Sequence, residues 1–186
     1  MPYIHHYPSI NKWFHWIIGV GIVAMLGFGY YMEGLESSPM KFTYYGWHKS
    51  IGIIILALVI VRVIVRIRTK TPPLPRHMSL WQRISSHISH ALLYIMMLYM
   101  PLTGWLMSSS AGYDVSIFGS PAIPNLVGKN KDMAAWFNNL HEIGLWVFVA
   151  LIIIHAGAAF IHHFYYKDDV LLRMLPAKKN LQENDI

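Results

Sequence analysis

Four long apolar segments dominate this sequence and constrain its fold more than any other feature. They cover about residues 13–31, 44–65, 87–107 and 140–164. A helix needs about 20 mostly apolar residues to cross the hydrocarbon core of a bilayer, and each segment is long enough. The sequence therefore predicts an all-α fold, a transmembrane four-helix bundle. With 186 residues in total, we expect residues 1–186 to form a single membrane domain.

The amino-acid composition supports a membrane protein and narrows its chemistry. Hydrophobic residues make up 55% of the chain and charged residues only 13%, about half the charge of a typical globular domain. The absence of cysteine excludes disulfides, iron–sulfur clusters, thiol catalysis and covalent haem attachment through a CxxCH motif. The 11 histidines outnumber the 9 acidic residues. Imidazole is therefore the main side chain with which this chain can hold a metal.

Basic residues are distributed unequally between the two ends of the predicted helices. Eleven of the 15 lie on the side that carries both termini, namely Lys12, Arg62, Arg66, Arg68, Lys70, Arg76, Arg83, Lys167, Arg173, Lys178 and Lys179. Because cytoplasmic loops of membrane proteins are enriched in Lys and Arg, we expect both termini in the cytoplasm. The net charge of +6 is then mainly a signal of orientation. We expect no nucleic-acid partner, since no basic stripe interleaves with aromatic residues.

Four histidines inside the predicted helices fall into two groups by depth. His48 and His141 each lie near the start of an inward-running helix, and so near the outer face. His15 lies near the start of an outward-running helix, and so near the inner face. His155 follows His141 by 14 residues, about four turns and about 21 Å along the same face of one helix. The sequence thus pairs His48 with His141 at the outer side and His15 with His155 at the inner side.

Two imidazoles at each of two depths can hold two b-type haems, each with both axial positions filled by His. We therefore predict two haem b cofactors, with these four histidines as the iron ligands. Small residues that leave room for a porphyrin follow each ligand by three or four positions: Gly19, Gly52, Gly144, Ala158 and Ala159. His90 competes with His15 by depth, although bulky Leu93 and Tyr94 follow it. The alternative is that these buried histidines only make hydrogen bonds between helices.

Three basic residues near the predicted histidine pairs are candidates for binding haem propionates. Arg62 and Arg66 lie four residues apart on one face of the second helix, near its inner end. Guanidinium groups suit carboxylates, so both arginines could pair with the inner haem. Lys49, next to His48, could do the same at the outer side. The alternative for the arginines is that they only extend toward the lipid headgroups.

The motifs of this chain resemble those of the bacterial cytochrome b561 family, over nearly its whole length. They are FHW at 14–16, HKSIG at 48–52, TPP at 71–73, HISH at 87–90, HEIG at 141–144 and KDDVLLRMLP at 167–176. The resemblance implies a two-haem, four-helix cytochrome b of the bacterial inner membrane. It also implies similarity to the cytochrome b subunits of formate dehydrogenase and hydrogenase, in which the fourth helix supplies one ligand to each haem.

The resemblance further implies electron transfer between an outer-side one-electron donor, with superoxide one proposal, and the quinone pool, with ubiquinone as acceptor. Such a protein is an oxidoreductase whose partners are quinone, a small donor and the lipid bilayer, and a dimer or a redox partner protein stays open. Candidates for the quinone site are Arg83, His87, His90 and Tyr94. One alternative is an electron-conduit and anchor subunit for a peripheral dehydrogenase. A further alternative is a haem-free transporter that relays protons through histidines.

Overall fold

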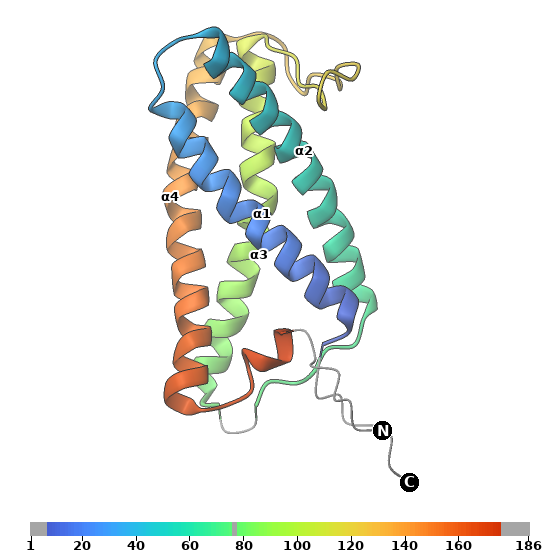
Figure 1. The fold of residues 1–186 in the computed structure, drawn as a ribbon, viewed down its shortest axis with the longest axis vertical. Coiled ribbons are helices and arrows are strands. Elements are labelled where there is room, and N and C mark those ends of the chain that lie inside the picture. Colours follow the sequence, from blue (N-terminus) through green and yellow to red (C-terminus); the bar gives the residue numbers. More distant parts are fainter. Residues whose placement is uncertain (1–6, 76–77, 176–186) are drawn as a thin grey trace.

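The computed structural model describes residues 7–75 and 78–175, and within them it contains four long helices (Figure 1). These are α1 (Ser9–Glu33), α2 (Pro39–Arg68), α3 (Leu80–Ala111) and α4 (Lys131–Ile161). A π-helical turn, η1 (His162–Tyr166), continues α4, and a short 3₁₀ turn, η2 (Leu172–Met174), follows. Beta structure in the described residues is limited to one isolated bridge between Val115 and Ile123. The predicted all-α class is confirmed.

Each helix begins before the apolar segment that predicted it, and polar side chains cap the starts of α2, α3 and α4. Ser38 and Ser79 accept backbone hydrogen bonds at the starts of α2 and α3, and Gln82 completes a capping box with Ser79. Asn130 caps α4, so that helix begins about nine residues before the predicted span. The loop expected over residues 108–139 is therefore shorter and spans 112–130. Caps of this kind satisfy the first backbone N–H groups of a helix, which otherwise lack partners.

The four helices form two hairpins. Close backbone contacts join α1 to α2, α2 to α3, and most extensively α3 to α4. Helix α4 makes few or no close backbone contacts with α1 or with α2 within the described chain. In Figure 1, α1 crosses in front of the other helices at an angle. Space for something other than backbone therefore lies between α4 and the first hairpin.

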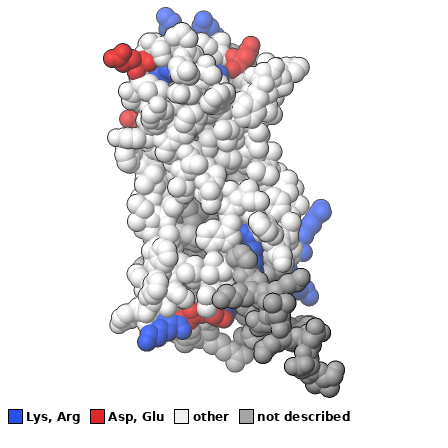
Figure 2. All heavy atoms as spheres, viewed as in Figure 1, with Lys and Arg blue, Asp and Glu red and all other residues white. Residues whose placement is uncertain are grey.

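The buried core is small and the apolar surface is large, as expected for helices that face lipid. The core centres on residues from all four helices: Ile18, Ile22, Ile55, Val59, Met96, Met97 and Phe148. Many large apolar side chains, such as Val20, Ile95 and Ile153, are more than half exposed. Figure 2 shows an uncharged middle with Lys, Arg, Asp and Glu gathered at the two ends. All four helices are long and apolar enough to cross a membrane, so the transmembrane prediction fits the structure.

The first and last described segments lie together at one end of the bundle. The Lys12 ammonium donates to the Leu175 carbonyl (2.9 Å), and the Trp16 indole donates to the Met174 carbonyl (2.9 Å). We call this end the inner end and the opposite end the outer end, after the predicted orientation. Arg76, Lys178 and Lys179, three of the basic residues counted for that prediction, lie outside the described residues.

Candidate functional site

The structure brings the four predicted histidines together as two pairs, one near each end of α4. At the outer end, the ring centroids of His48 and His141 lie 6.4 Å apart. At the inner end, those of His15 and His155 lie 6.2 Å apart. Each pair therefore joins α4 to a helix of the first hairpin, across the space where close backbone contacts are few or absent. The partners are those that depth along the helices predicts.

The separation of the rings suits two imidazoles on one iron. A metal–nitrogen bond to His is about 2.0–2.1 Å, so two rings on opposite sides of one metal have centroids about 6 Å apart. Both predicted pairs match this spacing. The Nδ1 atom of His48 is buried and has no hydrogen-bond partner among the described residues.

The outer pair is tightly enclosed by neighbouring helices. A methyl group added at Gly29 of α1 would lie 3.2 Å from Cε1 of His48, and one added at Gly104 of α3 would lie 3.2 Å from Cε1 of His141. The Thr103 hydroxyl oxygen lies 3.1 Å from Nδ1 of His141. Two glycines and one threonine thus set the position of these two rings.

The inner end holds three histidines rather than two. The His90 ring centroid lies 5.2 Å from that of His155, closer than the His15 ring. His90 Nδ1 lies 2.7 Å from the Ser86 carbonyl, to which it donates, and this leaves its Nε2 lone pair available. The competition between His15 and His90 that the sequence predicts is therefore present in the structure.

The Arg62 guanidinium contacts the inner group directly. One of its nitrogens lies 3.1 Å from Nδ1 of His15, and its guanidinium carbon lies 5.6 Å from the Tyr94 ring centroid. Arginine only donates hydrogen bonds, so here the His15 Nδ1 atom accepts and Nε2 carries the proton. Nε2 of His15 can bind a metal only after it loses that proton. Arg62 must then turn away from the ring, toward another hydrogen-bond acceptor.

The other two candidate propionate partners face other groups. The guanidinium carbon of Arg66 lies 5.7 Å from the ring centroid of Tyr7. The ammonium group of Lys49 donates to the Asp114 carbonyl (2.7 Å) and the Ser108 hydroxyl (3.3 Å). Lys49 therefore fastens the outer loop to α2 in this structure. Among the three, Arg62 is the basic residue that contacts a predicted ligand.

The small residues beside the histidines divide into two kinds. Nothing lies within 4 Å of a methyl group added at Gly19 or Gly52, which leaves open space one turn after His15 and His48. Gly144 differs, because a methyl group there would lie 2.7 Å from both Met100 Sδ and Tyr99 Cε1. The expectation that Gly144 makes room for a porphyrin is wrong in this structure, since α3 packs against it. Open space beside two ligands, together with the ring spacing, fits a planar group held by imidazoles.

An apolar groove opens between α1 and α4 at the level between the two histidine pairs. Its volume is about 400 Å³, and it is lined by Val23, Leu26, Gly27, Tyr30, Leu145, Trp146, Val149, Ile152 and Ile153. The groove lies where α1 of the first hairpin faces α4 of the second.

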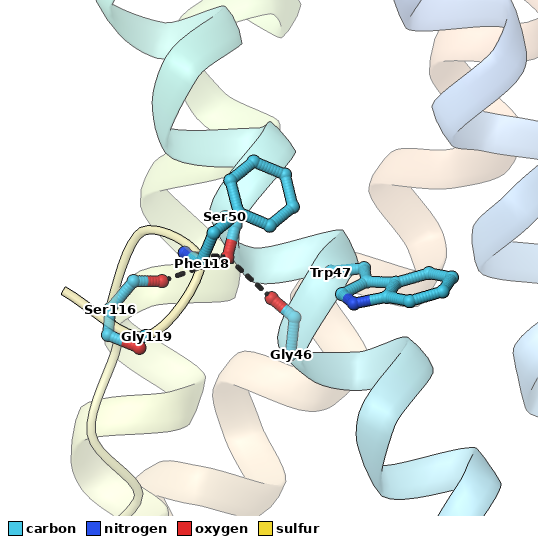
Figure 3. A pocket seen from close by; sticks show the side chains of 6 residues that line it. All are labelled: Gly46, Trp47, Ser50, Ser116, Phe118 and Gly119. Carbon is cyan, nitrogen blue, oxygen red and sulfur yellow. Dashed lines mark hydrogen bonds between the residues drawn. The ribbon is translucent and has the colours of Figure 1, made fainter.

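The outer loop is fastened to α2 two residues after His48 (Figure 3). The backbone N–H of Phe118 donates to the Ser50 hydroxyl oxygen (3.0 Å), and that oxygen also lies 2.8 Å from the Gly46 carbonyl and 2.9 Å from the Ser116 carbonyl. Phe118 has φ of 48° and Gly119 has φ of 84°, positive values at both centres of a tight turn. Bulky residues rarely adopt this conformation. A cavity of about 230 Å³ lies between this turn and Trp47.

Sequence reasoning missed a buried acid–base pair at the inner end. The Nδ1 atom of His162 lies 2.6 Å from a carboxylate oxygen of Asp168, and both side chains are largely buried. These residues are six apart, a spacing that places them on no common helical face. The π-helical turn η1 and the left-handed conformation of Lys167, with φ of 53°, bring them together.

Of the quinone-site candidates, Tyr94 lies under the Arg62 guanidinium, and Arg83 donates to the Pro75 carbonyl (3.4 Å).

Comparisons with known proteins agree with this arrangement. A family model for prokaryotic cytochrome b561 matches residues 6–177. The chain is 32% identical to cytochrome b561 homolog 2 of Escherichia coli (strain K12) over 177 residues, 91% of this chain and 90% of that protein. It is 31% identical to cytochrome b561 homolog 1 of the same organism over 181 residues, 95% of this chain and 100% of that protein. It is also 31% identical over 132 residues to the probable superoxide oxidase CybB of Yersinia pestis, 71% of this chain and 74% of that protein.

Proposed function

This chain belongs to the prokaryotic cytochrome b561 family, and from that premise we propose that it is a two-haem cytochrome that carries electrons from an outer-side donor to membrane quinone. Membership of the family makes it a membrane cytochrome that binds haem b and takes part in electron transport. The observation that carries the finer proposal is the presence of two histidine pairs, each with the ring spacing of two ligands on one iron.

Four histidines would hold the cofactors, His48 and His141 at the outer end and His15 and His155 at the inner end. Haem bound there would supply reversible one-electron chemistry, and two such groups would give redox centres near both faces of the membrane. The protein's own contribution is to orient the imidazoles, exclude water with its apolar core and place positive charge nearby. Arg62, Arg66 and Lys49 are the proposed propionate partners.

We propose superoxide as the donor and ubiquinone as the acceptor. A relative from Yersinia pestis bears the name probable superoxide oxidase, and this supports superoxide oxidation here. Two superoxide anions give up one electron each and become two molecules of oxygen. One ubiquinone takes up these two electrons and two protons and becomes ubiquinol, so atoms and charge balance. The ammonium groups at the outer end, Lys41, Lys49, Lys129 and Lys131, favour the approach of a small anion.

The proposed membrane orientation places both termini in the cytoplasm of a bacterial cell, with the protein as one inner-membrane domain. The support is the excess of Lys and Arg at the inner end, together with the contacts of Lys12 and Trp16 that join the first and last described segments there. Because reporter fusions distinguish the two faces of a membrane, a fusion at either terminus that is active only in the periplasm would contradict this orientation.

The first experiment asks whether the purified protein holds two haems. We expect two haem b per chain, both low-spin with two imidazole ligands, measured by pyridine haemochrome assay and by electron paramagnetic resonance. A colourless protein would contradict the whole proposal.

Rapid mixing with superoxide and a soluble quinone analogue then tests the reaction. Reduction of the quinone that needs an added dehydrogenase subunit would indicate an electron conduit instead of a stand-alone enzyme.

The second experiment tests the pairing of the ligands. We expect His48→Ala and His141→Ala to lose the same haem, and His15→Ala and His155→Ala to lose the other, because one missing axial ligand weakens retention of the iron. His163→Ala, a change beyond the end of α4, serves as the matched control and should keep both haems. If His90→Ala loses the inner haem while His15→Ala keeps it, the inner pair is instead His90 with His155.

A further inference from the structure

We infer that Thr103 is a positioning residue that accepts a hydrogen bond from Nδ1 of His141 and so directs the Nε2 atom of that ring toward the iron. The inference rests on the proposed role of His141 as a haem ligand and deepens it. Thr103 lies in α3 and is 5% exposed. Its hydroxyl oxygen lies 3.1 Å from His141 Nδ1 across the interface between α3 and α4.

The hydrogen bonds of the Thr103 hydroxyl determine its direction. A hydroxyl group has one proton to donate and two lone pairs with which to accept. The carbonyl oxygens of Tyr99 and Met100 lie 2.9 Å and 3.0 Å from this hydroxyl oxygen, and carbonyls can only accept. When the Thr103 proton goes to either carbonyl, the hydroxyl oxygen is free to accept from the His141 ring. Nδ1 then carries the ring proton, and the lone pair is left on Nε2.

A neutral imidazole can bind a metal only through the nitrogen that lacks the proton. Metal-binding histidines almost always donate their other N–H to a fixed acceptor, which sets the protonated nitrogen, orients the ring and makes the ligand a stronger electron donor. Thr103 supplies such an acceptor for His141, and the Met100 backbone is a second hydrogen-bond partner of the same ring. Gly104, the next residue, lets the ring lie close to α3, since a methyl group there would lie 3.2 Å from Cε1 of His141.

His48 and His15 lack this arrangement in the described structure. The Nδ1 atom of His48 has no hydrogen-bond partner, and that of His15 faces the Arg62 guanidinium, which can only donate. The His141 ring is thus set for binding through Nε2, and so is that of His90, the competing inner ligand, whose Nδ1 atom donates to the Ser86 carbonyl. The outer site should depend on Thr103, and the inner site should not.

The test compares Thr103→Val, which removes the hydroxyl but keeps the branched shape, with Thr103→Ser, which keeps the hydroxyl. We expect Thr103→Val to release the outer haem about 10-fold faster or more and to raise its midpoint potential, because a weaker ligand stabilises oxidised iron less. Thr103→Ser should keep the wild-type release rate and midpoint potential of the outer haem. The inner haem should be unchanged in both variants. Thr43→Val is the matched control, since the hydrogen-bond partner of the Thr43 hydroxyl among the described residues is the Pro39 carbonyl.

Several outcomes would overturn the role of Thr103 while the proposed function stands. One is a two-haem wild type in which Thr103→Val leaves the outer potential and release rate unchanged. Another is an equal change at both haems, and a third is a Thr103→Ser protein that behaves like Thr103→Val. A wild type without haem would instead contradict the proposed function itself.

A second measurement does not depend on the folding of Thr103→Val. In a His141→Gly protein, added imidazole and added 1-methylimidazole can both bind iron, but only imidazole retains an N–H to donate to Thr103. We expect imidazole to give the lower outer-haem potential, nearer that of the wild type, and 1-methylimidazole the higher one. Equal potentials with the two ligands would show that the Thr103 hydroxyl does not act through the ring N–H, and the inference would fail.

Discussion

Both ends of the bundle bring histidine rings from different helices close together, but the surroundings of the rings differ. At the outer end, His48 and His141 lie against Gly29 and Gly104, and Thr103 accepts from the His141 ring. At the inner end, His15 and His90 both approach His155, and Arg62 donates to His15. The His141 ring is therefore oriented by Thr103, whereas the His15 ring accepts from Arg62 through Nδ1 and so carries its proton on Nε2.

If two haems bind as proposed, this difference gives two chemically similar groups unequal environments. The outer rings are positioned by close contact with small residues and by one neutral hydrogen bond. The inner rings share their space with a guanidinium charge and with one another. Positive charge beside an iron centre disfavours its more positive, oxidised form, so the inner environment raises the midpoint potential relative to a site without Arg62.

The largest expected effect comes from His155→Ala, because His155 is the common partner of His15 and His90. We expect this change to abolish inner-haem binding and leave one haem per chain, whichever of the other two rings is the second ligand. Optical spectra and haem content per chain measure the result, with His141→Ala as the mirror experiment at the outer site. A His155→Ala protein that keeps two haems would remove the basis for comparing the two ends.

Gly104→Ala should disturb the outer end alone. The added methyl group would lie 3.2 Å from Cε1 of His141, so the ring or α3 must shift, at a cost of about 1–3 kcal/mol in stability. We expect a lower unfolding temperature and weaker retention of the outer haem, with the inner spectrum preserved. Gly27→Ala is the control, because nothing lies within 4 Å of a methyl group there. Equal loss in both variants would mean that close contact with the ring is not what positions His141.

Arg62→Gln should change the inner end alone. Loss of the guanidinium charge removes a cation next to the inner group, so we expect the inner midpoint potential to fall and the outer one to stay constant in a redox titration. Arg68→Gln, further toward the inner end of α2, is the matched control because Arg68 is exposed and is not among the proposed propionate partners. If Arg62→Gln shifts both potentials equally, the environments of the two sites are less separate than the structure indicates.

The smallest expected effect is that of Ser50→Ala at the outer loop. The Phe118 N–H would lose its acceptor, at a cost of about 0.5–1.5 kcal/mol. We expect faster hydrogen exchange at Phe118 and its neighbours, with both haem spectra unchanged. A loss of outer haem in this variant would show that the loop, as well as α1 and α3, positions the outer pair.

The sequence was sufficient to predict the fold and the ends of the bundle at which the histidines gather, because hydropathy and helical periodicity are local properties. Each apolar segment is a helix, and the 14-residue spacing of His141 and His155 places them at the levels of His48 and His15. The residues at which α3 and α4 begin were less predictable, since their N-caps, Ser79 and Asn130, lie well outside the apolar segments.

Contacts between helices could not be predicted from the sequence, because they depend on helix rotation and tilt. Nothing in the sequence near Thr103 indicates that its hydroxyl reaches His141. The sequence also predicted space beside Gly144, which Tyr99 and Met100 occupy. The pairing of His162 with Asp168 needs a π-helical turn and a left-handed Lys167, and neither follows from hydropathy.

The division of the bundle into two hairpins has a consequence for how the protein is made. During synthesis α1 and α2 emerge first and can pack together before α4 exists, since domains and their parts form in the order of the chain. His15 and His48 are then both in place, but each lacks its partner until α4 arrives with His141 and His155. Because backbone contacts between α4 and the first hairpin are few or absent, binding of the cofactors and docking of the last helix become one linked equilibrium. Supply of haem thereby acts on the yield of finished protein as well as on its redox activity.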